Sequence, residues 1–323
     1  MDRAGALQEY RDAVQERRAE FRKDMAAYLA GQGDELEDVV RTAMKLVGEQ
    51  MAETGKEYVC TLCISLLKTD LISGRYRFMC HGLDMRWYLD DEPVEVYVED
   101  RELLAPLRQL WGVLEQERQG YGGAVNVYDA RNLLFEELPY IDATICSILR
   151  WRLRDWEEKG IFDSVPRSPY WMLKWGEYRD RTEILVQTDR VEKDATAWKT
   201  EVANAAHEPE ALIFSYWYRG TCGGKDCKGL DMRFSTFEEA LLDGVAFLEC
   251  NLEGSRFRKS TLSRCCFDGS NLRGADFRGC SFEGTSFAGA NLEAAVFPAE
   301  SVPFLGIGAE QLQVILLDRG DKA

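Results

Sequence analysis

The last third of the chain repeats every five residues, and this period limits its fold more than any other feature of the sequence. Phe or Leu occupies every fifth position from Phe237 to Phe297, through thirteen consecutive units. A small or modest side chain lies two residues before each centre, and Gly follows two residues after it in seven units. This pattern predicts a chain that turns by a fixed angle in every pentapeptide. The centres expected inside the coil are Phe237, Leu242, Phe247, Leu252, Phe257, Leu262, Phe267, Leu272, Phe277, Phe282, Phe287, Leu292 and Phe297.

A second and weaker period of twenty residues indicates how many turns close one coil. Asn251, Asn271 and Asn291 each stand directly before a Leu centre. Twenty residues divided into units of five make four sides per coil, with like side chains stacked above like. We expect the three asparagines to form one hydrogen-bonded ladder along a single edge.

The units SNLRG, ADFRG and ANLEA resemble the pentapeptide-repeat family, whose pattern is A-(D/N)-L-x-x. The resemblance covers about residues 230–300, under a quarter of the chain. It implies an all-β solenoid, a right-handed quadrilateral β-helix. Repeats of this kind offer extended surfaces to protein partners.

The residues after the last unit predict an end to the coil. Pro298 and Pro303 interrupt it, and the apolar residues that follow predict a short helix, so residues 301–323 are expected to form a C-terminal cap. These apolar residues are Leu312, Ile315, Leu316 and Leu317. In several members of the family such a helix also dimerises the protein, so the resemblance allows a homodimer through this helix.

Opposite charges are expected one coil apart on one side of the solenoid. The predicted pairs are Glu238 with Arg258, Glu239 with Lys259, and Arg256 with Asp276. Exposed pairs of this kind contribute ~0–1 kcal/mol each. They predict an ion-pair ladder on this side, and not a site for nucleic acid.

Residues 1–229 are expected to form a separate α+β domain. Apolar spacing predicts a long helix over residues 3–30, and Asp34 with Glu37 resembles a capping box that opens a second helix. Alternating apolar residues predict a small antiparallel sheet over residues 58–98. Further helices are expected over residues 101–118, 129–158 and 190–206, and a strand over residues 211–219.

A short segment of this domain occurs again at the start of the repeats. CHGLDMRW spans residues 80–87, and CKGLDMRF spans residues 227–234, where Met232 already follows the five-residue period. The echo predicts one local shape used twice, through a duplication or by coincidence.

The cysteines offer weak candidates for a metal site. Zinc needs four converging ligands, usually from two close pairs. The candidates are Cys63, Cys80, Cys222 and Cys227. Since Cys63 lies in an apolar alternating run, buried free thiols are the preferred interpretation, and we expect no metal and no cofactor.

Signals for catalysis are few. The segment GTCGGKD (220–226) lacks the spacing and the Ser or Thr of a phosphate-binding loop, and the chain holds only two histidines and no G-x-S-x-G. Trp171, Trp175 and Tyr178 follow at helical spacing. They predict core packing, with an exposed protein-binding cluster as the alternative.

Charge and hydropathy exclude two classes of partner. A net charge of −16 argues against nucleic-acid binding, and no run of eighteen apolar residues could cross a membrane. The first residues are charged and contain no apolar stretch for secretion, so ten cysteines are expected as reduced thiols in a cytoplasmic protein.

The function that follows is a non-enzymatic protein-protein interaction or scaffold protein with an unknown protein partner. The family implies an alternative, since some members imitate DNA and bind type II topoisomerases. Thirteen units make about three coils, only ~15 Å tall. Residues 230–323 carry 14 acidic and 9 basic side chains, a net charge of −5, which is low for a DNA mimic. An uncharacterised enzyme within residues 1–229 is the second alternative.

Overall fold

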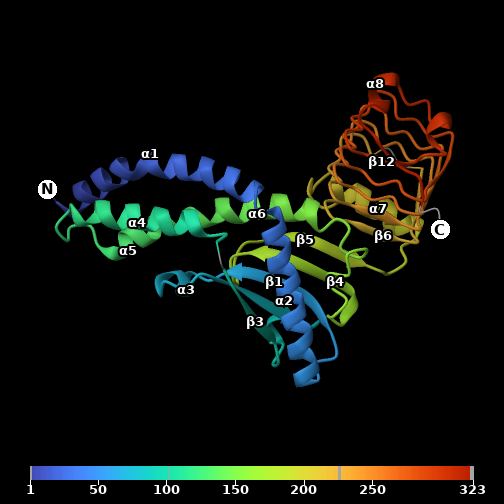
Figure 1. Cartoon of the computed structure of the whole chain (residues 1–323). Helices are drawn as coiled ribbons and strands as arrows, with labels where there is room; N and C mark the ends of the chain where they lie inside the picture. The colour runs from blue at the N-terminus through green and yellow to red at the C-terminus, as the bar shows by residue number, and fades with distance from the viewer. Residues whose placement is uncertain (1, 101, 225–226, 321–323) are drawn as a thin grey trace. The chain divides into compact units, whose positions relative to one another are not determined.

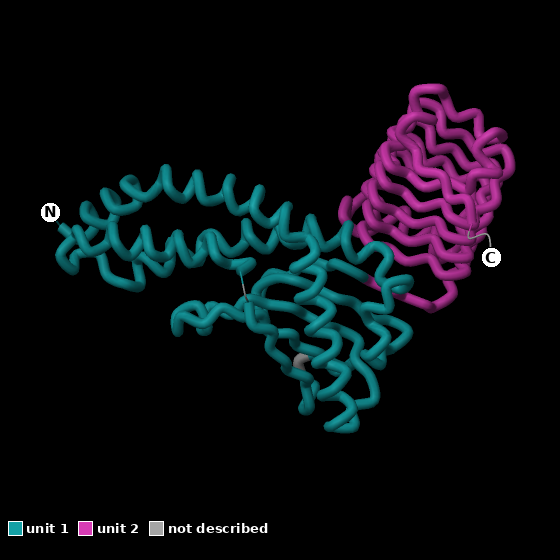
Figure 2. Tube along the Cα trace, viewed as in Figure 1, with its two compact units in different colours: residues 1–186 teal, residues 187–323 magenta. Residues whose placement is uncertain are grey.

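The structure is a computed structural model that describes residues 2–100, 102–224 and 227–320. Two compact units divide the chain, Met1–Val186 and Gln187–Ala323 (Figure 2). The boundary therefore precedes the predicted one at residue 229, because the solenoid and the helix that covers its first coil begin earlier in the chain. Lys225 and Asp226 of the glycine-rich segment lie outside the described residues.

The first unit is built on a mixed five-stranded sheet, in the order β3-β2-β1-β4-β5. Its strands are β1 (Val59–Leu66), β2 (Arg77–Leu83), β3 (Val94–Glu99), β4 (Arg167–Gly176) and β5 (Thr182–Asp189). The predicted antiparallel part is correct, because β1, β2 and β3 pair in that way. The parallel neighbour of β1 is β4, which lies about a hundred residues further along the chain, so the local pattern did not predict it.

The helices of the first unit partly cover the sheet and partly extend beyond it, packed on one another (Figure 1). They are α1 (Arg3–Ala30), α2 (Gly33–Thr54), α3 (Lys68–Ile72), α4 (Ala105–Gln119), α5 (Val127–Phe135) and α6 (Leu138–Arg152). The single helix expected over residues 129–158 is wrong, because Pro139 begins a new helix there. The expected capping box at Asp34 is also wrong, since Gln32 precedes α2 without a side-chain cap. None of the helices within the described residues has the length and apolarity needed to span a bilayer.

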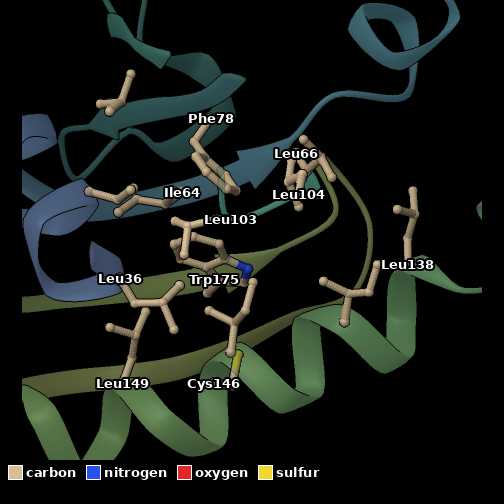
Figure 3. Packing of buried hydrophobic residues seen from close by; sticks show 14 of the residues in the cluster. Leu36, Ile64, Leu66, Phe78, Leu103, Leu104, Leu138, Cys146, Leu149 and Trp175 are labelled. Carbon is tan, nitrogen blue, oxygen red and sulfur yellow. The ribbon is translucent and has the colours of Figure 1, made fainter. Parts of the chain in front are cut away.

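The core of the first unit surrounds Trp175, which is fully buried (Figure 3). Its ring lies 5.2 Å from that of Phe78, and its indole N–H donates to Asp142 Oδ1 at 2.9 Å. Elsewhere in this unit the fully buried carboxylate of Glu137 accepts from Arg18 and Arg22, each at 2.6 Å. These two arginines of α1 thereby attach the long first helix to the start of α6.

The second unit is a solenoid of about five turns that extends over residues 216–318. Its strands are β6 (Tyr216–Tyr218), β7 (Thr221–Gly223), β8 (Thr236–Glu238), β9 (Leu241–Asp243), β10 (Thr261–Ser263), β11 (Ser281–Glu283), β12 (Val296–Pro298) and β13 (Leu316–Asp318). The parallel register pairs Thr261 with Leu241 on one side and with Ser281 on the other. This spacing of twenty residues confirms the four-sided coil.

Stacked aromatic rings fill the interior of the solenoid. Phe237, Phe257 and Phe277 form a column with ring centroids 4.8 Å apart, and Phe297 continues it at 4.7 Å. The corner residues adopt the left-handed conformation even where they are not Gly, as at Lys259 with φ 56°. A non-Gly residue there carries a strain of roughly 1–2 kcal/mol, which the stacked coils sustain.

The two ends of the solenoid differ from the prediction. The first coil begins before residue 230 and has Trp217, Cys222, Cys227 and Met232 at its centres. A helix covers this end, since Trp198 of α7 (Ala195–Ala205) is buried with its ring 5.0 Å from that of Trp217. The predicted C-terminal helical cap is mostly wrong. Two short helical segments, η2 (Val302–Phe304) and α8 (Ala309–Leu312), lie in the described part of the cap, and β13 then pairs with β12 and completes a further turn.

Candidate functional site

Four sides of the solenoid are defined by the units that stack on them, and the asparagine side carries the predicted ladder. Asn271 Nδ2 donates to Asn251 Oδ1 at 3.0 Å, and Asn291 Nδ2 donates to Asn271 Oδ1 at 3.1 Å. The amide of Asn271 thus donates to the preceding coil and accepts from the following coil. Such a row fixes the register of the coils.

Beside the ladder, the asparagine side carries charges that alternate from coil to coil. Arg273 lies 3.2 Å from Glu253 in the preceding coil and 3.4 Å from Glu293 in the following coil. Arg233 occupies the same position one coil before Glu253, where the charge of Glu253 helps to raise its pKa, after the larger effect of its hydrogen bond to Asp231. The net charge of this side is therefore close to zero. Its charged side chains pair with one another, which leaves little net charge for binding a polyanion.

A second charged side is formed by β6, β8 and the units that stack on them. Arg256 and Asp276 lie opposite each other across neighbouring coils, as the register predicts. The side chain of Asp276 is fully buried and accepts from Arg258 at 2.5 Å and from Arg278 at 2.8 Å. Because this carboxylate is buried, the expectation that all pairs of the ladder are exposed is wrong here.

Glu239, at a corner of the same side, pairs with the coil that precedes it. Arg219 Nε donates to its carboxylate at 2.9 Å. This bond holds the pKa of Glu239 below its ordinary value, and the charge of Lys259 in the following coil acts in the same direction. An arginine and a lysine thus flank the predicted acidic position on both sides.

The side formed by β7, β9, β10 and β11 is the flat sheet of the solenoid, and we name it the sheet side. Its outward residues along one row are Thr221, Leu241, Thr261 and Ser281, all exposed. The hydroxyls of Thr261 and Ser281 lie 3.2 Å apart. This row is uncharged and bears one large apolar side chain, Leu241.

The C-terminal end of the solenoid exposes the most apolar surface within the described part of the second unit. Its exposed large apolar residues are Phe304, Leu312, Val314, Leu316 and Leu317. Phe304 is 86% exposed, and Phe282 and Glu300 line a hollow of about 220 Å³ beside it. Strand β13 forms one edge of the two-stranded sheet β12-β13 at this end. The C-terminal end therefore has the features of a contact surface.

The predicted aromatic cluster lies in a strand and the turn after it, and not in a helix. Trp171 and Trp175 belong to β4 and are 4% and 0% exposed. The ring of Trp171 lies edge-on to that of Trp156 at 5.3 Å, and the ring of Tyr178 lies edge-on to that of His81 at 5.6 Å. The two tryptophans are buried, which confirms the predicted core packing, and the alternative of an exposed interaction cluster is wrong for them.

The four cysteine candidates are divided between the two units. Cys63 and Cys80 lie on the neighbouring strands β1 and β2, and burial raises the pKa of both thiols. Cys222 and Cys227 are buried centres of the first coil, and burial also raises the pKa of Cys222. Thiols held protonated are poor metal ligands. Within the described residues, no group of three or more His, Cys, Asp or Glu is arranged to hold a metal ion.

Asp142 is the carboxyl group with the largest upward pKa shift in the described part of the first unit. Burial raises its pKa to about 6, against the opposing effect of the Trp175 indole N–H. The two cavities described in this unit, beside Tyr28 and Tyr97 and beside Tyr76 and Trp111, are lined by other residues. We assign it a structural role, as the half-buried acceptor of the Trp175 indole N–H.

Comparison with known proteins identifies the repeat region. The family of pentapeptide repeats matches residues 235–274 and 265–297 with eight copies, and no family matches the N-terminal region. No curated protein matches the chain. Residues 235–297 therefore form a pentapeptide-repeat region, which covers under half of the chain.

Solved structures similar to the chain are themselves pentapeptide repeat proteins. Rfr23 of the cyanobacterium Cyanothece 51142 is 20% identical over 23% of this chain and 58% of its own, with a TM-score of 0.18. A protein of the Arabidopsis thaliana thylakoid lumen is 23% identical over 35% of this chain and 81% of its own, with a TM-score of 0.20. A protein of Nostoc PCC 7120 is 22% identical over 36% of this chain and 95% of its own, with a TM-score of 0.21. The chain thus spans less than two thirds of the first of these structures.

Proposed function

We propose that this chain, in which residues 235–297 are pentapeptide repeats, is a non-enzymatic interaction protein that binds a partner through the C-terminal end of its solenoid. The observation that carries the proposal is the group of five exposed apolar side chains at that end, among them Phe304 at 86% exposure. Exposed apolar groups of this kind mark surfaces that a partner covers. The helix α7 covers only the opposite end of the solenoid.

The partner that we favour is a second copy of the same chain. The edge strand β13 presents Leu316 and Leu317 together with one row of backbone groups that its sheet partner β12 does not use. A symmetric pair of solenoids would cover both edges at once, because each copy supplies the same patch.

The ten cysteines are free thiols, which supports a reducing compartment such as the cytoplasm.

A concentration series in analytical ultracentrifugation tests this proposal. We expect the wild-type chain to dimerise at micromolar concentration, and Leu316→Lys with Phe304→Ser to make it monomeric. Both side chains are about half exposed or more, so the variant should keep its fold. Leu241→Lys on the sheet side is the matched control and should dimerise like the wild type. A wild-type chain that is monomeric throughout the series contradicts the homodimer.

A DNA-mimicking topoisomerase inhibitor is the second candidate function. The solenoid is longer than the sequence predicted, and the greater length favours this candidate. About five turns make a stack of roughly 24 Å rather than ~15 Å. Residues 216–318 still carry 14 acidic and 10 basic side chains, a net charge of −4, and Arg258, Arg273 and Arg278 interrupt the acidic rows. A supercoiling assay with purified gyrase tests this candidate. If the chain protects gyrase from a poison, DNA mimicry becomes the preferred function over homodimerisation.

A further inference from the structure

A groove of about 680 Å³ lies on the first unit, between the helices and the edge of the sheet. The end of α1 contributes Tyr28, the first turns of α2 contribute Val39, and the edge strand β3 contributes Tyr97 and Val98. Ligand pockets of ordinary size have volumes of roughly 300–1,000 Å³. The groove is thus large enough for a small organic molecule or for one or two side chains of a peptide.

The groove is lined by negative charge. Its charged lining residues are Glu35, Asp38, Glu99, Asp100 and Glu102, and all five are carboxylates. Among the described residues, two cations lie close to them: Arg108, 3.4 Å from Asp100 and 3.7 Å from Glu102, and Arg77, the cross-strand partner of Glu99. The remaining carboxylates of α2 and β3 are exposed. Low-dielectric walls strengthen the field of such a cluster, so it attracts cations.

Asp100 at the base of the groove supplies a second and independent indication. Its side chain is fully buried, and its Oδ2 accepts from the backbone N–H of Leu104 at 3.3 Å and faces Arg108. Its Oδ1 is buried and makes no hydrogen bond of good geometry, although the backbone N–H of Leu103 lies near enough to lower the pKa of the carboxyl against the larger effect of burial. A buried carboxylate oxygen in this state is unfavourable, and Asp100 is one of the residues that line the groove, so a bound donor is a suitable partner for it.

The lining also has an apolar part suited to a methylene chain. The rings of Tyr28 and Tyr97 and the side chains of Val39, Val98 and Leu103 lie among the carboxylates. The guanidinium of Arg77 already lies 3.9 Å from the ring centre of Tyr97, which shows that this ring accepts a cation on one face. A metal ion would gain nothing from such walls, and the described carboxylates do not converge as metal ligands.

We propose that this groove binds an organic cation, a primary ammonium or guanidinium group on a methylene stem. The carboxylates of Glu35, Asp38 and Glu99 neutralise its charge, and the buried Oδ1 of Asp100 accepts one of its N–H groups. The stem lies against Tyr28 and Tyr97. A polyamine carries this chemistry, and so does the Lys or Arg side chain of a peptide.

Calorimetry on the full chain with two probes tests the proposal and distinguishes the two sources. The probes are spermidine and a short acetylated amide peptide containing one Lys and one Arg. We expect at least one of them to bind in the low-salt buffer and to weaken severalfold between about 20 mM and about 150 mM salt. Preference for spermidine assigns a polyamine, and preference for the peptide assigns a basic side chain.

Matched charge variants on one helix make the test specific. Glu35→Gln with Asp38→Asn removes two carboxylates from the groove, and we expect the dissociation constant to rise about tenfold or more. Glu49→Gln with Glu53→Gln removes two exposed carboxylates from the same helix outside the groove, and should leave binding within about twofold. Asp100→Asn should weaken binding without changing the apolar walls.

Three results would overturn the proposal. The first is no binding of either probe tighter than about 1 mM at low salt. The second is equal weakening in the groove variant and in the control variant, since this would mean unspecific attraction by the acidic surface. The third is unchanged binding in the groove variant. Because Glu35 and Asp38 are exposed, thermal unfolding of the variants should match that of the wild type, so each result is attributable to binding.

Discussion

The two units of this protein bury their side chains by different rules. In the second unit, the position within a five-residue period decides what a side chain contacts, so that Phe247, Phe267 and Phe287 stack in one column at 4.9 and 5.1 Å. In the first unit, contacts join segments far apart in the chain, as where Ile64 of β1 lies beside Trp175 of β4. A repeat makes the environment of a residue readable from its neighbours, whereas a non-repetitive core does not.

One short sequence occurs in both units and separates local from tertiary effects. In the first copy Asp84 accepts from the backbone N–H of Arg86 at 2.8 Å, and Trp87 has φ 56°. In the second copy Asp231 accepts from the backbone N–H of Arg233 at 3.2 Å, and Phe234 has φ 57°. The predicted shape is thus used twice, because the Asp side chain fixes the turn locally. Its origin in a duplication stays a prediction.

The largest expected effect is the destabilisation of the first unit by a substitution that leaves the second unit folded. Trp175→Ala removes the buried indole and should lower the stability of the first unit by about 3–5 kcal/mol. Since the two units have separate cores, hydrogen exchange should accelerate in β1 and β4 and stay unchanged in β10. Tyr128→Ala, at a residue that is 66% exposed, is the control. Equal acceleration in both units would show that they unfold together.

The next test uses the methionine of the shared segment in its two environments. Met232 is 0% exposed as a centre of the first coil, and Met85 is 67% exposed. Met232→Ala should lower the free energy of unfolding by about 2–4 kcal/mol, and Met85→Ala should change it by about 0.5 kcal/mol or less. Urea unfolding measures both. If the two variants lose similar free energies of unfolding, the local turn, and not burial, determines how much the methionine contributes to stability.

A smaller effect is expected when a buried ion pair of the solenoid is compared with an exposed one. Arg258→Ala removes one partner of the buried carboxylate of Asp276 and should destabilise by about 1–3 kcal/mol, while Arg278 keeps it partly satisfied. Arg273 is 48% exposed, so Arg273→Ala should have an effect of only about 0–1 kcal/mol. The two values come from thermal unfolding at low and high salt. An effect of Arg273→Ala as large as that of Arg258→Ala would contradict this ranking.

The smallest expected effect is the pH dependence of the first unit that arises from Asp142. Burial raises the pKa of this carboxyl from 3.8 to about 6, so the folded chain holds the proton more tightly than the unfolded chain. The contribution of Asp142 to stability is therefore present below about pH 4 and is lost as the pH rises through about 6. A shift of about two pKa units corresponds to ~3 kcal/mol at most, and solvent screening at this only partly buried residue reduces it, so Asp142→Asn should gain about 1 kcal/mol relative to wild type between these pH values. The free energy of unfolding of both proteins is measured as a function of pH. A difference between wild type and Asp142→Asn that stays constant at all pH values would contradict the raised pKa.

Several features were readable from the sequence because neighbouring residues determine them. The coil, its twenty-residue register and the asparagine ladder follow from a strict period, and the long helix α1 follows from apolar spacing. The first coil was only partly recognised, since Trp217, Cys222 and Cys227 stand where later coils have Phe or Leu. A search that accepts any buried side chain at the centre would have extended the solenoid to residue 216.

The C-terminal end and the acidic groove could not be derived in this way. Leu316 and Leu317 have an apolar pattern that suits a helix, and only pairing of β13 with β12 makes them a strand. The groove joins Tyr28 of α1, Asp38 of α2 and Tyr97 of β3, which no local pattern connects. Trp171 and Trp175 show the same limit, because a helical spacing of aromatic residues also fits the buried face of β4.

The sequence by itself determined every feature in which a residue interacts with a partner at a constant distance along the chain. These are the five-residue turn, the coil of four sides and the local Asp-x-Arg turn at residues 84–86 and 231–233. The tertiary structure alone decided which surfaces stay exposed, which strands meet and where carboxylates gather. The physical reason is that burial depends on the whole set of neighbours in space, and these neighbours are fixed only when distant segments pack together.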